Sequence, residues 1–208
     1  MRLPSFVLVT LFIVVTAITA AQPKAKPGAW LPLFDGKSLT GWEAKGNASW
    51  TVENGAIVGR QGPSGEPGDL FTTARFADFE LEAEWSMNWP GNSGFWFKYQ
   101  GPRTGCQADF LDQPSEPGIL SGSIYCMGKK FIAINRDPAT INKDGWNRLR
   151  MKIEKDRAQV WMNGKLVADG AADVFPGPGQ LGIQAHAGKE FANMEIRLRN
   201  VRVRRLSE

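Results

Sequence analysis

Through most of the chain, apolar residues recur at every second position, which is the period of a strand with one buried face. In the stretch 79–85, four apolar residues alternate with three glutamates. In the stretch 148–153, three apolar residues alternate with two arginines and a lysine. No stretch keeps a convincing helical period, so the pattern predicts an all-β chain.

The turn residues agree with this pattern. Asn54-Gly55 and Asn163-Gly164 each lie between two β-type segments, and both residue types tolerate the positive φ of type I′ hairpin turns. Stretches rich in Pro and Gly at 61–68, 114–118 and 176–179 predict loops. Many short antiparallel strands in a chain of this length predict a two-sheet antiparallel jelly-roll sandwich.

The first 21 residues predict an export signal. Arg2 gives a positive start, residues 6–18 form an apolar run, and Thr19-Ala20-Ala21 offers small residues for cleavage. A transmembrane anchor is the alternative, but a span needs about 20 apolar residues and this run is shorter. We therefore expect a signal peptide at 1–21, one domain at 22–208, a periplasmic or extracellular location and no stable membrane anchor.

The charge of the chain is modest, at +4, and five arginines gather near the C-terminus: Arg197, Arg199, Arg202, Arg204 and Arg205. A nucleic-acid-binding arm is one interpretation. However, these arginines mostly alternate with apolar residues, which is typical of the solvated face of an edge strand. We expect no nucleic-acid partner.

Cys106 and Cys126 are the only cysteines of the chain. Export into an oxidising compartment permits a disulfide. The two residues flank the turn-rich stretch 113–118 almost symmetrically, so they could face each other across paired strands. A disulfide and two buried free thiols both remain open.

The segment 105–112 is the most informative strand. Its alternation predicts that Cys106 and the apolar residues in phase with it face the core, whereas Gln107 and Asp109 project together from the opposite face. The two polar residues are then about 7 Å apart along the strand. A carboxylate beside an amide suits sugar hydroxyls, a divalent cation or a proton transfer. A solvated polar face is the ordinary alternative.

The segment 95–99 adds an aromatic candidate. Its alternation places Phe95, Phe97 and Tyr99 on one face and Trp96 and Lys98 on the other, polar face. An outward Trp is costly unless something stacks on it, and sugar rings present apolar C–H faces to aromatic rings. The combination is typical of a carbohydrate site, although several of the eight tryptophans must belong to the core.

His186 is the only histidine, and Gln184 shares its strand face. A histidine suits a general base or a metal ligand, but an isolated one is more often structural. No Cys/His metal spacing, phosphate-binding Gly loop or nucleophilic Ser motif is present. Oxygen-bearing side chains at Asp69, Asp112 and Glu116 leave room for a divalent cation such as calcium, without a recognised loop pattern.

Six segments resemble one known family, the 3-keto-disaccharide hydrolase domain family, over about residues 33–206. They occur in the family's order: Leu33-Phe34-Asp35-Gly36-Lys37-Ser38-Leu39-Thr40-Gly41-Trp42, Trp50-Thr51-Val52-Glu53-Asn54-Gly55, Asn92-Ser93-Gly94, Trp146-Asn147, Asn163-Gly164-Lys165 and Gly182-Ile183-Gln184-Ala185-His186. The resemblance implies a concanavalin A-like jelly roll, secretion and, for some members, cleavage of glycosides oxidised at the sugar 3-position. A 3-keto group acidifies the C2 proton, so a base can remove it, the C1 substituent leaves by elimination, and the enone takes up water.

Many members of this family carry Glu where Gln107 stands and Gln where Asp109 stands, so the resemblance transfers the acidic role to Asp109. An amide at position 107 also argues against a retaining glucanase, because it cannot form a glycosyl ester. We expect Asp109 as base or metal ligand and His186 as a second proton-transfer or ligand group. The residues expected to orient the sugar are Trp96, Lys98, Arg103, Gln107, Tyr125 and Gln184.

Lys98 or Arg103 would steady the enolate oxygen in this hypothesis. The alternative is a non-catalytic carbohydrate-binding or cell-surface module with the same fold. The sequence predicts a carbohydrate or glycoside ligand in both cases, and it makes no prediction of the sugar or of the oligomeric state.

Overall fold

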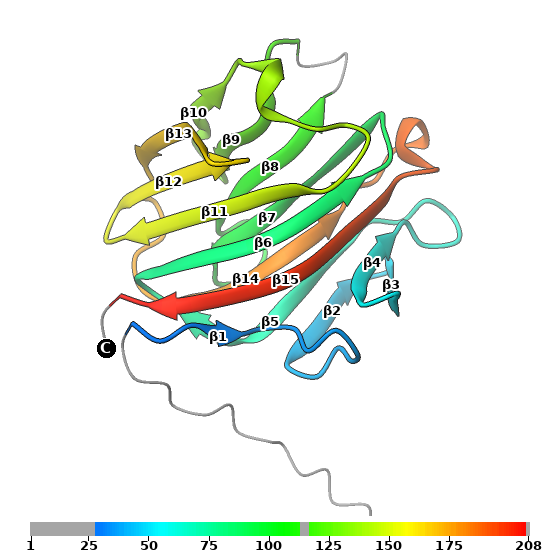
Figure 1. The fold of residues 1–208 in the computed structure, drawn as a ribbon, viewed down its shortest axis with the longest axis horizontal. Helices are drawn as coiled ribbons and strands as arrows, with labels where there is room; N and C mark the ends of the chain where they lie inside the picture. Colours follow the sequence, from blue (N-terminus) through cyan, green and yellow to red (C-terminus); the bar gives the residue numbers. More distant parts are fainter. Residues whose placement is uncertain (1–27, 113–116, 207–208) are drawn as a thin grey trace, which may run out of the picture.

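The computed structural model describes residues 28–112 and 117–206, which form two antiparallel sheets (Figure 1). The segment 1–21, predicted as a signal peptide, lies outside the described residues. Two 3-10 turns accompany the strands, η1 at Pro138–Thr140 and η2 at Lys189–Phe191. No helix in the described part of the chain is long and apolar enough to span a bilayer.

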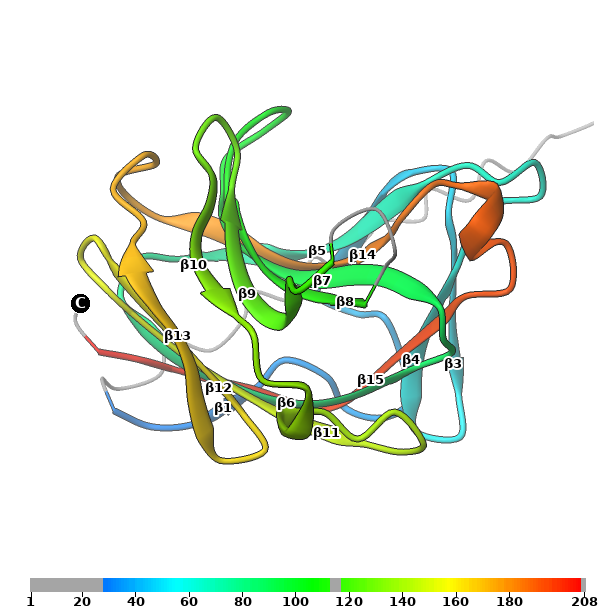
Figure 2. The same ribbon diagram turned by 90° about the horizontal axis from the view of Figure 1, so that it is seen from above.

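The first sheet has the strand order β10-β9-β8-β7-β14-β5-β2. Its strands are β2 (Trp42–Gly46), β5 (Gly68–Phe76), β7 (Gly91–Tyr99), β8 (Cys106–Asp112), β9 (Leu120–Cys126), β10 (Lys130–Asn135) and β14 (Gly179–Ala185). Figure 2 shows this sheet bent, with the β9–β10 hairpin rising at one side of its hollowed outer face. We call that surface the concave face.

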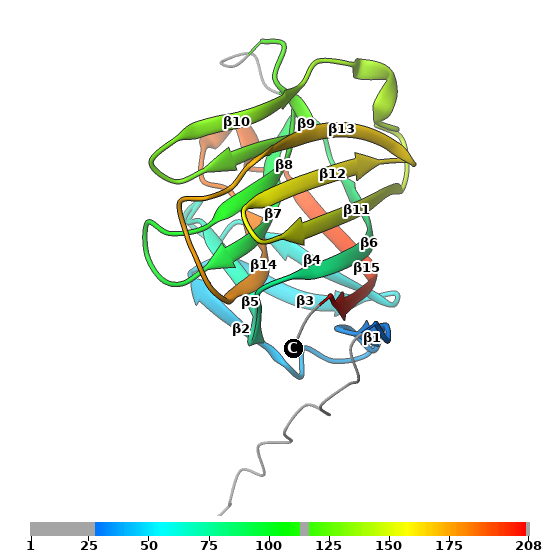
Figure 3. The same cartoon turned by 90° about the vertical axis from the view of Figure 1, so that its left-hand side faces the viewer.

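The second sheet has the order β13-β12-β11-β6-β15-β4-β3, and β1 pairs with β15. Its strands are β1 (Leu31–Pro32), β3 (Ser49–Glu53), β4 (Ala56–Arg60), β6 (Phe79–Met87), β11 (Asn147–Glu154), β12 (Arg157–Met162), β13 (Lys165–Ala171) and β15 (Glu195–Arg205). The two sheets meet at one side, where β10 and β13 lie next to each other (Figure 3). The predicted two-sheet antiparallel jelly roll is confirmed, and we call the outer surface of this second sheet the convex face.

The two predicted hairpins are confirmed. Asn54 and Gly55 join β3 to β4 with φ values of 50° and 76°, and Asn163 and Gly164 join β12 to β13 with 50° and 88°. Positive φ at both central residues is the requirement of a type I′ turn. The turn chemistry therefore sets the register of both hairpins.

The core lies between the sheets and follows the predicted alternation. The ring of Trp85 from β6 stacks on Phe110 from β8, with centroids 4.0 Å apart and planes 4° from parallel. Both side chains are fully buried. This contact joins the central strands of the two sheets and orients β8, because a buried Phe110 sends its sequence neighbours outward.

The expectation that the arginine-rich segment near the C-terminus forms an edge strand is wrong, because this segment is β15. It lies inside the second sheet, between β6 and β4. Its arginines do face solvent, as predicted, and three of the five are opposite a glutamate of β6: Arg199 with Glu84, Arg202 with Glu82 and Arg204 with Glu80. Opposite charges that face each other on paired strands are compatible with this interior position.

The disulfide left open by the sequence is present. Cys106 and Cys126 are direct register partners on β8 and β9, and their sulfurs are bonded. Both residues are fully buried beneath the concave face. The bond ties together the two strands that carry Gln107 and Tyr125.

Candidate functional site

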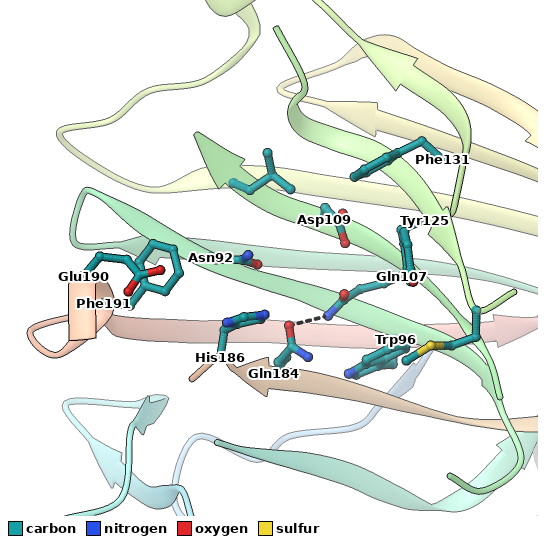
Figure 4. Close-up of a pocket in the computed structure, with 12 residues that line it drawn as sticks. Asn92, Trp96, Gln107, Asp109, Tyr125, Phe131, Gln184, His186, Glu190 and Phe191 are labelled. Carbon is teal, nitrogen blue, oxygen red and sulfur yellow. Dashed lines mark hydrogen bonds between the residues drawn. The ribbon is translucent and has the colours of Figure 1, made fainter. Parts of the chain in front are cut away.

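A cleft of about 390 Å³ lies on the concave face (Figure 4). It is lined by Asn92, Trp96, Gln107, Asp109, Leu111, Tyr125, Met127, Phe131, Gln184, His186, Glu190 and Phe191. Six of the eight side chains predicted for the site are among these: Trp96, Gln107, Asp109, Tyr125, Gln184 and His186. The other two, Arg103 and Lys98, lie elsewhere.

β8 positions the central polar pair as its alternation predicts. Ala108 points into the core, whereas Gln107 and Asp109 point into the cleft and are each only 5% exposed. At this burial a polar side chain is stable only if hydrogen bonds replace its water, so the pair is held in place rather than freely solvated.

Gly94 of β7 explains how Gln107 reaches across the sheet. A Cβ at Gly94 would lie 2.5 Å from Cγ of Gln107, so a larger residue would have to displace this side chain. Gln107 therefore lies across β7, and its Nε2 donates to Oε1 of Gln184 on β14 at 3.3 Å. The two amides form a bridge over the middle of the cleft floor (Figure 4).

His186 follows β14 and is fixed from two sides. Its Nδ1 lies 2.5 Å from the carbonyl oxygen of Ala187, and its ring packs edge-on against Phe191 at 5.8 Å. With Nδ1 donating to that carbonyl, the neutral ring has Nε2 as its acceptor. The geometry is that of an oriented base or ligand.

Tyr125 and Phe131 form an aromatic wall on the β9–β10 hairpin. They are register partners, and their rings meet edge to face at 5.5 Å. Both are half-buried, so they offer apolar surface to a ligand. The sequence analysis missed Phe131, because its place opposite Tyr125 depends on the pairing of two strands. Trp96, the predicted stacking residue, is only 4% exposed and contributes a narrow strip of surface.

A second cleft, of about 340 Å³, adjoins the first. Trp96, Met127, Gln184 and His186 line both clefts. Arg103, on the exposed loop after β7, lines the second cleft and not the first, as do Tyr99 and Asp69. The concave face is therefore one groove with two compartments.

Asp69 is a titratable residue of the groove that the sequence analysis did not assign to catalysis or sugar binding, as are Glu190 in the first cleft and Tyr99 in the second. Burial raises its pKa from 3.8 to about 6, and the hydrogen bond from Trp96 and the nearby charges of His186 and Lys45 oppose the shift only in part. The indole N–H of Trp96 donates to its Oδ1 at 2.7 Å. Asp69 directly follows a predicted loop, and its outward direction could have been found from the buried Leu70 beside it.

The predicted position of Lys98 is wrong. Trp96 and Tyr99 on β7 pair with Gly182 and Gln180 on β14, so β7 holds one extra residue, and Lys98 has a φ of 53°. The β-bulge reverses the alternation for the residues that follow it, so the ammonium of Lys98 points into the core and not onto the concave face. The ring of Tyr99 moves to the concave face, where it stacks on Phe71 at 3.9 Å.

The ammonium of Lys98 is 2% exposed and donates to the carbonyl oxygens of Lys155 and Ala172 at 2.9 and 3.0 Å. These acceptors belong to the turn after β11 and the end of β13, on the other sheet. Lys98 therefore joins the two sheets and cannot steady an enolate on the concave face.

The described residues do not form a cluster of ligands that would support the possible divalent cation. Within residues 28–112 and 117–206, no group of three or more His, Cys, Asp or Glu side chains is arranged to hold a metal ion. Of the three residues considered for calcium, Asp69 lies on β5 with an indole partner, and Glu116 lies outside the described residues.

Comparison with known proteins places this geometry in a family context. The 3-keto-alpha-glucoside-1,2-lyase-like domain matches residues 29–204. A 3-keto-disaccharide hydrolase of Bacteroides thetaiotaomicron is 36% identical over 80 residues, which are 34% of this chain and 28% of that protein's length.

Solved structures with the same fold include the carbohydrate-binding module CBM66 from Bacillus subtilis, with a TM-score of 0.61 and 20% identity, covering 79% of this chain and 95% of the module. A galectin-like protein of unknown function from Bacillus subtilis has a TM-score of 0.69 and 15% identity, covering 86% of this chain and 97% of its own. At these identities the likeness shows the fold alone. The family match and the related hydrolase identify a carbohydrate-active domain.

Proposed function

This chain belongs to the 3-keto-alpha-glucoside-1,2-lyase-like domain family, and on that premise we propose that it cleaves glycosides oxidised at the sugar 3-position. The observation that carries the proposal is the meeting of a carboxylate, two amides and an oriented imidazole in one cleft. Elimination from a 3-keto-glycoside needs a base for the C2 proton and donors for the enolate oxygen, and these groups supply both.

Asp109 is the proposed base. It lies on the central strand of the cleft floor and is 5% exposed, in surroundings from which most water is excluded. His186 is the second proton-transfer group, with Nε2 as the acceptor atom.

The enolate oxygen needs hydrogen-bond donors, and with Lys98 in the core the concave face must provide others. The amide N–H groups of Gln107 and Gln184 and the hydroxyl of Tyr125 line the cleft. Fixed neutral donors stabilise a developing oxyanion because they need no reorganisation during the reaction. Arg103 would act from the second compartment, on the part of the substrate that leaves.

The test is turnover of a 3-keto-glycoside by Asp109→Asn. We expect kcat/KM to fall by at least about 100-fold, the usual loss when a general base is removed. The matched control is Asp169→Asn, which changes a carboxylate on β13 that pairs with Arg157 on the convex side. Release of the aglycone, followed by chromatography, measures both. Unchanged turnover in Asp109→Asn would remove this residue from the mechanism.

A second function is supported by the amide at position 107, where many family members carry an acid. It is a non-catalytic carbohydrate-binding module that uses the wall of Tyr125 and Phe131. Binding on a glycan array without product formation, lost in Tyr125→Ala, would favour this function over catalysis.

We also propose that the protein is exported to the periplasm or the exterior of the cell. This proposal rests on the N-terminal sequence pattern alone, and detection of the mature chain outside the cytoplasm tests it.

A further inference from the structure

The two compartments of the groove hold different carboxyl groups. Asp109 lines the first compartment and not the second, and Asp69 lines the second and not the first. Gln184, His186 and Trp96 line both compartments and so mark the boundary between them. A substrate of two parts joined by one bond fits this division, with the bond above these shared residues.

Neighbouring strands and one hydrogen bond hold Asp69 in the second compartment. It lies on β5 between Lys45 of β2 and Gln184 of β14, its direct register partners. The indole of Trp96 holds one of its oxygens. The titratable groups that act on it or respond to it are Lys45 from β2, His186 after β14 and Tyr99 from β7.

We propose that Asp69 is the proton-transfer group for the leaving oxygen of the glycoside and, afterwards, for the attacking water. This role rests on the proposed function, since it divides the work of that reaction between two carboxyl groups. It also assigns the second compartment to the aglycone and the first to the oxidised ring.

The proton and electron movements balance without a further reactant. Asp109 takes the C2 proton, the C2–H electron pair forms the C1–C2 double bond, and the C1–O bond breaks. The leaving oxygen keeps that bond's electron pair and takes the proton of Asp69. In the return step, Asp69 takes a proton from water as its oxygen adds to C1, and C2 takes back the proton held by Asp109.

A carboxyl group can serve both steps only if its protonated and ionised forms are both accessible near working pH. Burial provides this, because it raises the pKa of Asp69 to about 6. The hydrogen bond from Trp96 opposes the rise, since an N–H donor favours the ionised form. Removal of that donor should therefore raise the pKa further.

The experiment compares two leaving groups in Asp69→Asn, with Asp169→Asn as the control. Asn keeps an oxygen for the Trp96 indole, so the fold is preserved. For a 3-keto-disaccharide, whose leaving alcohol needs a proton, we expect kcat/KM to fall by about 100-fold or more. For a 4-nitrophenyl 3-keto-glucoside, whose leaving group is stable as an anion, the fall should be below about 10-fold.

The pH profile gives a second readout that a structural role would not move. On the disaccharide, wild-type kcat/KM should decline as the pH rises through about 6. Trp96→Phe should move that decline to higher pH, and Asp69→Asn should abolish it. With an active wild type, equal losses on the two substrates, or none on either, overturn the role of Asp69 alone. A wild type that turns over neither substrate overturns the proposed function and this role with it.

Discussion

One carboxyl group on each outer face of the sandwich, Glu53 and Asp69, shows two opposite environments for an acidic side chain. On the convex face, glutamates meet guanidinium groups; Glu53, for example, is bonded by Arg60, which lowers its pKa to about 2. On the concave face, Asp69 receives its hydrogen bond from an uncharged indole, and burial raises its pKa to about 6.

The comparison distinguishes carboxylates that stay ionised and serve solubility from carboxyl groups that can gain or lose a proton during a reaction. A carboxylate held by arginine stays ionised at any working pH and is a poor base. A carboxyl group desolvated without such a partner titrates near neutral pH and suits acid–base catalysis. Three predictions test this contrast, beginning with the largest expected effect.

The contrast between the two faces requires that the ammonium of Lys98 is buried in the interior, because on the concave face it would be a charged partner for the carboxyl groups there. Lys98→Met removes the donor to the carbonyls of Lys155 and Ala172, so we expect a loss of about 2–4 kcal/mol in the free energy of unfolding. Turnover per folded molecule should be nearly unchanged. Urea denaturation and active-site-normalised kinetics measure the two quantities. Lys152→Met, a matched change on β11 of the convex face, should cost less than about 1 kcal/mol. A fall in kcat for Lys98→Met without a loss of stability would return Lys98 to the site.

The raised pKa of Asp69 predicts a stability cost that depends on pH. Folding favours the protonated form, so the penalty is absent below the ordinary value of 3.8 and grows as the pH rises to about 6. Asp69→Asn is uncharged at every pH and escapes this penalty. It should be more stable than wild type by about 2 kcal/mol at pH 7, and by less than about 0.5 kcal/mol near pH 3.5. Urea denaturation at the two pH values measures the difference. A variant that is less stable than wild type at pH 7 would show that Asp69 is structural.

The smallest effect is expected on the convex face. Glu82→Gln removes the partner of Arg202, but both side chains are at least one-third exposed. We expect a loss below about 1 kcal/mol, and a smaller one in high salt, because solvent screens exposed pairs. Thermal unfolding at low and high salt measures it, with turnover as the control. A change in turnover would mean that the two faces are coupled.

Much of the concave face could be predicted from alternation, because the pleat of a strand is a local property. The buried Phe110 fixes the outward direction of Gln107 and Asp109 on this face, and two Asn-Gly pairs fix two hairpins of the second sheet. The family resemblance, carried by short segments in order, was equally readable from the sequence.

The departures are all consequences of pairing between distant segments. Alternation fails at Lys98 because a bulge depends on the register between β7 and β14, which lie some eighty residues apart. β15 lies in the middle of its sheet because it pairs with both β6 and β4, which come more than a hundred residues earlier in the chain. The fit of Gln107 over Gly94 likewise requires two paired strands.

By itself, the sequence determined the strands, their turns and which side chains of each regular strand share a face, since these depend on neighbours along the chain. Only the tertiary structure decided that Asp69 is desolvated beside Trp96 and that Lys98 leaves the site. Desolvation and strand register arise from atoms that the fold brings together, and no local pattern specifies them.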